Sequence, residues 1–259
     1  MSELSARALT VRKGGARLLD DVSLTLRSGE LVAVVGENGA GKTTLLDRLA
    51  GVLPAEMGHV TLDDARVERL SSRARARAIA SCAQSAPSPP DLVVAARIGQ
   101  GLAPRRGFAA LLDDGARAAV RDVAEELGLL GLLGRSLGTL SGGERRRVQV
   151  ARALVDDEAR AYLLDEPHAG VDVRHQPLVS EALRRRARAG KLVVASVHDL
   201  GLALELADRV VGLREGRIIV DGTPEVALSP AGVRALFDVD GHIVRSPSGA
   251  RSVIVSSRA

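Results

Sequence analysis

The stretch from Gly36 to Thr44 reads GENGAGKTT, which puts three glycines, a lysine and two threonines within nine residues. Glycines let the backbone turn its N–H groups inward around an anion, and a lysine adds a compact positive charge. Lysine is rare here, since the 36 basic residues are almost all arginines, so Lys42 stands out. These residue types favour a site for phosphate groups.

The spacing G-x-x-x-x-G-K-T lies between an apolar run, 31–35, and a segment with helical leucine spacing, 42–53. This strand–loop–helix context predicts a nucleotide-binding P-loop rather than a chance glycine turn. Lys42 is expected to reach the β- and γ-phosphates, and the Thr43 hydroxyl to bind Mg²⁺. The residues expected to hold the nucleotide are Gly36, Asn38, Gly39, Ala40, Gly41, Lys42, Thr43 and Thr44.

Two acids end a second apolar run, which reads RAYLLDEP over residues 160–167. A strand that ends in acids places them at the edge of a sheet, beside the loops that bind ligands. We expect Asp165 to hold Mg²⁺ through water and Glu166 to polarise a water that attacks the γ-phosphate. A strand-end acidic pair without a function is the alternative.

A third motif, LSGGE, covers residues 140–144 and is followed by RRRVQVARAL. Ser141 is a good helix N-cap, and the two glycines leave N–H groups available at the helix start. The motif predicts a second anion-binding helix end in a chain that has one P-loop. Taken alone, an ordinary capped helix explains it equally well.

The elements that must position these motifs alternate along the chain. Continuous or alternating apolar segments predict strands, and apolar residues at helical spacing predict helices. The alternation indicates a parallel sheet with crossover helices and a mostly helical insertion between about 85 and 155. Strands are expected at 7–12, 22–26, 31–35, 58–64, 160–167 and 192–199, a hairpin at 209–222, helices at 42–53, 113–131, 144–155, 177–190 and 200–208, and an irregular, Pro-rich stretch at 85–107.

Composition narrows the class of protein. The chain has 259 residues with 46% hydrophobic residues, one Tyr, two Phe and no Trp, so its core must be aliphatic. The single cysteine, Cys82, excludes an internal disulfide and a cysteine-based zinc site. No apolar run approaches the ~20 residues of a membrane span and the start lacks a signal-peptide pattern, so we expect a cytosolic protein. The arginines of 73–77 favour a solvated face over nucleic-acid binding.

Together the P-loop, the LSGGE motif and the strand-end acids resemble the ATP-binding subunits of ABC transporters, over nearly the whole chain. The resemblance implies an α/β fold, with a P-loop NTPase (RecA-like) core, an N-terminal antiparallel β subdomain and an inserted α-helical subdomain. The implied divisions are 1–84 for the first part of the core with the β subdomain, 85–155 for the helical subdomain with the signature motif, 156–223 for the second part of the core, and 224–259 for a C-terminal extension with a hairpin.

The same resemblance assigns further site residues. Gln84 matches the Q-loop glutamine, His198 the switch histidine and Asp172 the D-loop aspartate. It implies that Glu166, His198, Gln84 and Lys42 act in catalysis and that Thr43, Gln84 and Asp165 lie around Mg²⁺. Two copies are expected to form a head-to-tail homodimer, with each ATP between one P-loop and the partner's Ser141 and Gly143. The segment after Gln84 is expected to dock on a transmembrane permease, at 85–107.

Two departures from the family pattern concern Lys13, which stands where an aromatic ring usually stacks on adenine, and His168-Ala169-Gly170, which replaces the commoner Thr-Ser-Ala or Thr-Ser-Gly before the D-loop. The tail after residue 206 is similar to subunits that import iron–siderophore complexes, haem or cobalamin. This implies ATP-driven import of a metal chelate at the inner membrane face, with a substrate-binding protein as an indirect partner. An ABC ATPase for another imported or exported cargo is the alternative. A non-transport ABC ATPase acting on nucleic acid is disfavoured, because the sequence lacks cysteine zinc modules, a long heptad region and a second P-loop.

Overall fold

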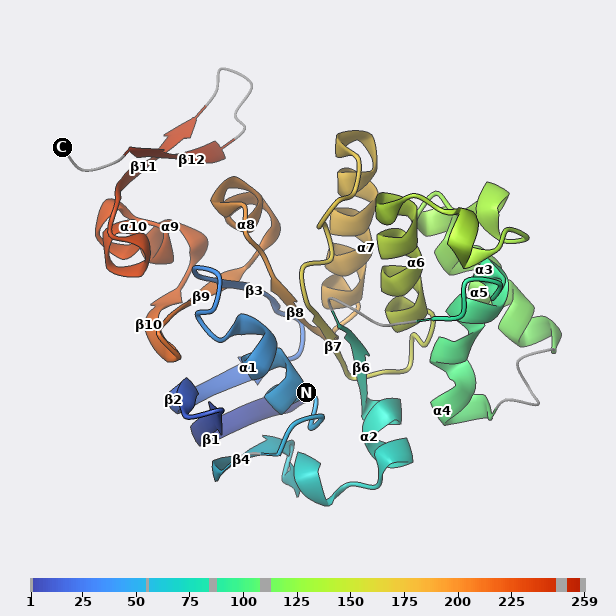
Figure 1. Ribbon diagram of the computed structural model, residues 1–259, viewed down its shortest axis with the longest axis horizontal. Helices are drawn as coiled ribbons and strands as arrows, with labels where there is room; N and C mark the ends of the chain where they lie inside the picture. Colours follow the sequence, from blue (N-terminus) through green and yellow to red (C-terminus); the bar gives the residue numbers. More distant parts are fainter. Residues whose placement is uncertain (1, 55, 84–87, 108–112, 246–250, 257–259) are drawn as a thin grey trace.

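The computed structural model describes residues 2–54, 56–83, 88–107, 113–245 and 251–256. A six-stranded sheet in the order β10-β9-β3-β8-β7-β6 runs through its centre (Figure 1). All neighbouring strands pair in parallel except β10, which forms a hairpin with β9. The strands are β3 (Leu31–Val35), β6 (Ile79–Cys82), β7 (Ala161–Leu164), β8 (Leu192–Ser196), β9 (Arg209–Arg214) and β10 (Arg217–Gly222).

The central strands are buried on both faces, as the continuous apolar runs predict. In β3, Leu31, Ala33 and Val35 contribute to the core beneath the helices, whereas Val32 and Val34 contribute to a second core on the other face. Successive strand residues point to opposite faces, so a strand between two cores must be apolar at every position. Helix α1 (Lys42–Leu49) packs in the second core.

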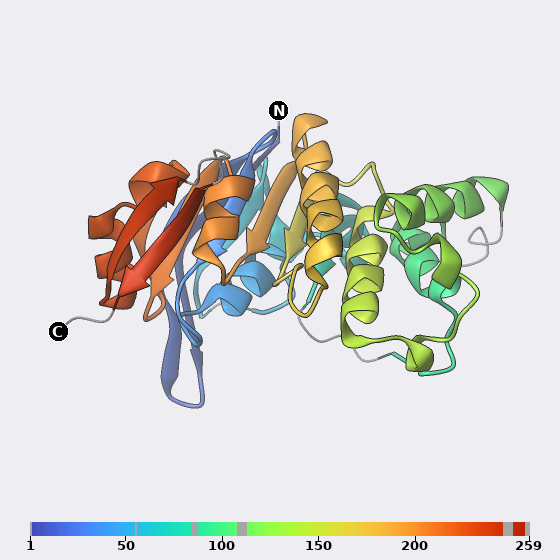
Figure 2. The ribbon, with the colours of Figure 1, turned by 90° about the horizontal axis from the view of Figure 1, so that it is seen from above.

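A second, antiparallel sheet completes that core and confirms the expected β subdomain. Its strands are β1 (Glu3–Lys13), β2 (Ala16–Arg27), β4 (Met57–Leu62) and β5 (Ala65–Arg66), in the order β2-β1-β4-β5. The β1–β2 hairpin, drawn in blue, extends away from the body of the molecule in Figure 2. Lys13 lies at its tip, where it pairs with Ala16.

The helical part lies beside β6 and β7 (Figure 1). It contains α3 (Val94–Gly99), η2 (Gln100–Leu102), α4 (Ala103–Arg106), α5 (Asp114–Glu126), the single turns η4 (Leu130–Leu132) and η5 (Leu137–Thr139), and α6 (Gly142–Leu154). Two expectations need correction. Residues 94–106 are helical, because the proline cluster ends at Pro90 and Pro104 occupies the first turn of α4, where a missing N–H costs nothing. The predicted helix 113–131 ends at Glu126, because Gly128 adopts a φ of 64°.

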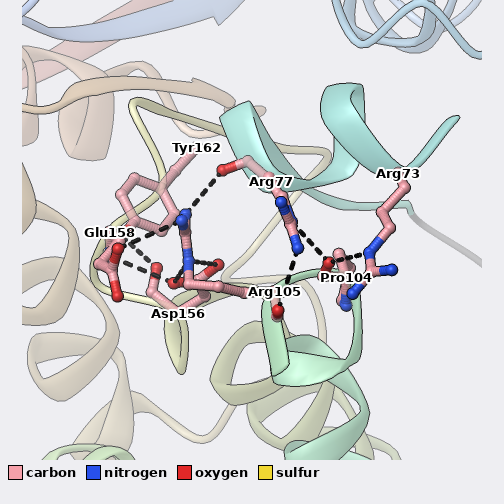
Figure 3. A network of polar contacts seen from close by, with 7 residues as sticks. All are labelled: Arg73, Arg77, Pro104, Arg105, Asp156, Glu158 and Tyr162. Atoms are coloured by element: carbon pink, nitrogen blue, oxygen red, sulfur yellow. Dashed lines mark hydrogen bonds and ion pairs between the residues drawn. The ribbon is translucent and has the colours of Figure 1, made fainter. Parts of the chain in front are cut away.

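An arginine network ties the far end of this helical part to the core (Figure 3). The guanidinium of Arg105 donates from Nε to both carboxylate oxygens of Asp156, at 3.0 and 3.1 Å, and from Nη2 to the carbonyl of Arg77. Arg73 and Arg77 of α2 (Ser72–Ala78) both donate to the carbonyl of Pro104. Two arginines of the basic run therefore cap the end of α4, which is a structural role.

The remaining elements follow the second half of the sheet. They are η6 (Val173–His175), α7 (Gln176–Arg188), α8 (Leu200–Leu206), α9 (Pro224–Ala227), α10 (Pro230–Phe237), β11 (Asp240–Arg245) and β12 (Arg251–Ser256), with η1 (Val67–Arg69) earlier in the chain. The expected closing hairpin is β11–β12, and Arg251 of β12 donates to the carbonyl of Leu204 at the end of α8. Among the described helices, none is both long and apolar enough to span a bilayer.

Candidate active site

The segments that follow strands β3, β7 and β8 meet at one edge of the central sheet. Strand β8 lies between β3 and β7, and all three are parallel, so their carboxyl ends point the same way. In open α/β sheets this edge is where ligands bind. A cleft of about 490 Å³ opens there. Its lining residues are Leu18, Asn38, Gly39, Gly41, Lys42, Thr43, Thr44, Glu166 and His198.

The loop after β3 has a backbone path that only glycine permits at two positions. A Cβ on Gly36 would lie 2.2 Å from the carbonyl oxygen of Leu213, and one on Gly41 would lie 2.5 Å from that of Leu18. Both residues also have positive φ, 149° and 105°. The loop leads directly into α1, whose first N–H groups have no partners within the helix and favour an anion.

The side chain of Lys42 folds back onto the phosphate loop. Its ammonium donates to the carbonyl oxygens of Gly36 and Glu37, at 2.8 and 2.9 Å, and the side chain is buried. Burial lowers the pKa of Lys42 below its ordinary value, while the carboxylates of Glu166 and Asp165 act in the opposite direction. A buried ammonium beside a loop of inward N–H groups suits a phosphate chain.

Two oxygen groups that suit Mg²⁺ are already paired. The Thr43 hydroxyl donates to Oδ2 of Asp165 at 2.8 Å, and Oδ1 of Asp165 accepts from the Ser196 hydroxyl at 2.6 Å. Hydroxyl and carboxylate oxygens are the hard ligands that Mg²⁺ takes together with waters and phosphates. The residues present therefore fit a magnesium ion beside the phosphates.

Glu166 has an unusual backbone for a residue with a side chain, since its φ is 50°. Its N–H donates to the Ser196 hydroxyl at 2.7 Å, and its carboxylate forms a hydrogen bond with Nε2 of His198. Left-handed backbone at a non-glycine residue costs roughly 1–3 kcal/mol and clusters at active sites. The conformation directs the Glu166 carboxylate into the cleft, beside Lys42 and Thr43.

The LSGGE segment starts helix α6 with a reciprocal cap. The Ser141 hydroxyl accepts from the N–H of Glu144 at 3.2 Å, and the Glu144 carboxylate accepts from the N–H of Ser141 at 2.7 Å. That backbone hydrogen bond from Ser141 lowers the pKa of Glu144. Gly143 lies against Gly170, where a Cβ would approach the carbonyl oxygen to 2.4 Å. Ser141 and Gly143 do not line the cleft beside this chain's P-loop.

Other residues expected from the sequence lie around these groups. Asp172 directly precedes η6 with a largely exposed side chain, two residues after Gly170, which lies against Gly143. Gln84 lies outside the described residues, next to Ala83 at the end of β6. Lys13 does not line the cleft, whereas Leu18 on β2 does. His168 is buried and hydrogen-bonded to the Ser180 hydroxyl at 3.0 Å, and burial lowers the pKa of His168 to about 4.

Three residues of this site were not singled out from the sequence. Ser196 is a fully buried serine in an apolar strand, and that polarity was a usable signal. Arg146 is buried and donates to backbone carbonyls of the strand-end acids, but nothing in RRR distinguishes it from its neighbours. Leu18 carries no signal, because an apolar residue on an amphipathic strand reads as core.

Comparison with known proteins gives a consistent result. Residues 19–169 match the ABC transporter family. The chain is similar to the hemin import ATP-binding protein HmuV of Bordetella pertussis, with 38% identity over 98% of this chain and 99% of that protein. HmuV of Rhodopseudomonas palustris (strain CGA009) is 43% identical over 91% of this chain and 88% of that protein.

Solved structures share the fold. An inward-facing conformation of a putative metal-chelate type ABC transporter aligns over 100% of this chain and 99% of that one, with a TM-score of 0.82 and 22% identity. A nucleotide-free ATP-binding cassette from an ABC transporter aligns over 91% of this chain and 98% of that one, with a TM-score of 0.77 and 22% identity. At this identity the likeness concerns the fold.

Proposed function

This chain belongs to the ABC transporter family of ATP-binding subunits, and from that premise we propose that it hydrolyses ATP to power import of haem or a related metal chelate through a separate permease. The observation that carries the enzymatic part is the single cleft in which the phosphate loop, the Thr43–Asp165 pair and the Glu166–His198 pair meet. The cargo rests on the full-length similarity to hemin import proteins.

The proposed mechanism assigns one task to each group. The N–H groups of the loop and the ammonium of Lys42 bind the phosphates. Thr43, and Asp165 through water, would hold Mg²⁺, which would supply positive charge to neutralise the phosphates. Glu166 accepts a proton from a water molecule while the water oxygen attacks the γ-phosphorus. The bond between the γ-phosphorus and the β–γ bridging oxygen breaks, and ADP leaves. His198 orients the Glu166 carboxylate through their hydrogen bond.

We also propose the head-to-tail homodimer. The capped start of α6 is exposed and outside this chain's own cleft, so its anion-binding end is available to a nucleotide on a second copy. A C₂ arrangement makes both composite sites equivalent. In this arrangement Ser141 and Gly143 complete the partner's site, and Asp172 and Gln84 retain the roles implied by the family.

The permease contact is proposed for the segment after Gln84. The three consecutive apolar residues of this segment suggest an exposed docking surface in the sequence, but only Val93 is exposed, at 39%. Leu92 is partly buried, and Val94 is buried in the core, so that reading is wrong for Val94. The residues before α3 are hydrogen-bonded to the loop that leads to Ser141, through Leu137 N to Leu92 O and Gly138 N to Pro90 O. These hydrogen bonds connect the proposed permease contact directly to the loop that precedes Ser141.

Cysteine crosslinking in membranes tests the function. With Cys82 replaced by Ser, Val93→Cys is expected to crosslink to a multi-span membrane protein, and mass spectrometry of the adduct identifies the permease. The controls are Val52→Cys and Ile254→Cys, whose parent residues are more exposed than Val93 but belong to other segments, the loop after α1 and strand β12. Crosslinks from Ile254→Cys alone would move the docking surface to the C-terminal hairpin, and a ribosomal or nucleic-acid-bound adduct would contradict a transport role.

Nucleotide titration tests how the base is held. An aromatic ring stacked on a base contributes ~1–3 kcal/mol, against roughly 0.5–1 for an exposed cation–π contact. The family resemblance places residue 13 against the base although Lys13 does not line the cleft, so Lys13→Tyr is expected to tighten ATP binding by about threefold to tenfold. We also expect poor discrimination between ATP and GTP, because Leu18 offers only an apolar wall. Equal ATP affinity for wild type, Lys13→Ala and Lys13→Tyr would show that the hairpin tip does not contact the base.

A further inference from the structure

Arg146 connects the signature helix to the catalytic segment of its own chain. It lies in α6, five residues after Ser141, and is buried. Its Nε donates to the carbonyl of Glu166 at 3.0 Å, Nη1 to that of Ala83 at 3.0 Å, and Nη2 to that of Asp165. One guanidinium thus contacts the segments that follow both β6 and β7.

The two carbonyls at the strand-end acids lie on either side of the Glu166 Cα. The carbonyl of Asp165 belongs to the peptide plane before this Cα, and the carbonyl of Glu166 to the plane after it. A planar guanidinium that binds both oxygens fixes how the two planes are rotated, which means that it fixes φ and ψ of Glu166. The left-handed φ of 50° costs free energy at a residue with a side chain, and the two hydrogen bonds from Arg146 oppose its relaxation.

We infer that Arg146 is a positioning residue for hydrolysis, which holds the Glu166 backbone left-handed and so keeps its carboxylate directed at the nucleotide cleft of the same subunit. The inference rests on the proposed role of Glu166 as the base. Because Ser141 starts the same helix and serves the partner's nucleotide, α6 joins two sites. Its first turn acts on the partner's ATP, and Arg146 acts on the chain's own catalytic carboxylate.

The neighbouring arginine provides a matched control. Arg147 is also buried, and its Nη1 donates to the carbonyls of Leu127 and Gly128 at 2.7 and 2.9 Å, which all lie in the helical part. Both arginines thus lie on the same helix, α6, are buried, and donate to backbone carbonyls of other segments. They differ in which segment they hold, so a general loss of helix stability affects both variants and a loss of Glu166 positioning affects only one.

The first test compares kcat with ATP affinity. Arg146→Met is expected to lower kcat by about tenfold or more while the Kd for ATP stays within about threefold, because the phosphate loop is untouched. Arg147→Met should keep kcat within about threefold despite a similar fall in melting temperature. Arg146→Lys, which keeps a donor, should recover part of the rate. Equal losses of kcat in the two Met variants would overturn the inference. If Arg146→Met does not fold, Arg146→Lys against Arg147→Lys decides by the same criterion.

The second test asks which subunit Arg146 serves. Heterodimers isolated through two affinity tags combine Ser141→Arg in one copy with Arg146→Met in the other. The first copy's cleft then has an intact Arg146 and receives an intact Ser141 from its partner. We expect the activity of a Ser141→Arg/wild-type heterodimer. Loss of that activity would show that Arg146 acts through the signature on the partner's site. Inactivity of Ser141→Arg/wild type itself would refute the composite site and leave the kcat comparison of Arg146 and Arg147 as the deciding result.

Discussion

Glu166→Gln is expected to bind ATP normally and to hydrolyse it about 10²–10⁴-fold more slowly than wild type, the usual effect of removing a positioned base. The amide keeps the size of the side chain but cannot accept the proton of the attacking water. The phosphate loop and the Thr43–Asp165 pair are unchanged, so ATP should accumulate uncleaved and hold two copies together. Single-turnover hydrolysis and light scattering with and without ATP measure both effects.

Glu215→Gln is the matched control for that variant. Glu215 also has a left-handed φ, 51°, but its side chain is exposed in the turn between β9 and β10 and does not line the cleft. The same chemical change there should leave turnover within about twofold of wild type. Turnover of Glu166→Gln within a few-fold of wild type would remove Glu166 from the role of base, and would leave His198 or a substrate-assisted route to explain hydrolysis.

Ser141→Arg is expected to abolish hydrolysis by the homodimer while ATP binding to each copy remains. The exposed start of α6 receives a long charged side chain where the γ-phosphate of the partner's nucleotide is expected, but this chain's own cleft is untouched. Mixing Ser141→Arg with Lys42→Ala copies should restore one of two composite sites, hence at most about half of the wild-type rate in purified heterodimers.

The control for steric damage is Ser71→Arg, the same change at an exposed, capping N-cap serine that does not line the cleft, at the start of α2. It should leave turnover within about twofold of wild type. Demonstrated heterodimers of Ser141→Arg and Lys42→Ala that stay inactive would argue against head-to-tail assembly. Full activity of the Ser141→Arg homodimer would instead show that the LSGGE segment binds no nucleotide.

Much of the fold and of the site could be predicted because its signals are local. The run 31–35 matches β3 residue for residue, since a strand between two cores must be apolar throughout. The phosphate loop needs glycines at fixed spacing, and the start of α6 has its serine and glutamate three residues apart, as the capping box requires. Each of these patterns is complete within about ten residues, so no knowledge of the rest of the chain is needed.

The segment 85–107, predicted to be irregular, shows where prediction from local sequence patterns fails. Prolines at 87, 89 and 90 made the whole of 85–107 look irregular. The helices at 94–106 form because Val94, Ile98 and Leu102 are buried against α5 and α6, a condition set by residues about 25 to 50 positions away. Helix propensity is weak beside such packing. The exposure of Val93 and the burial of Val94 follow from the same contacts.

The sequence by itself determined the phosphate loop, the strand-end acids, the capped helix start at LSGGE and thus the family. Only the tertiary structure decided how these groups act together. Ser196 joins Asp165 to the backbone of Glu166, His198 approaches the Glu166 carboxylate, and Arg146 rather than Arg147 holds the left-handed turn. The partners of Glu166 are 20 to 32 positions distant along the chain. Packing of the sheet and helices brings them together, and no local pattern specifies which donor meets which carbonyl.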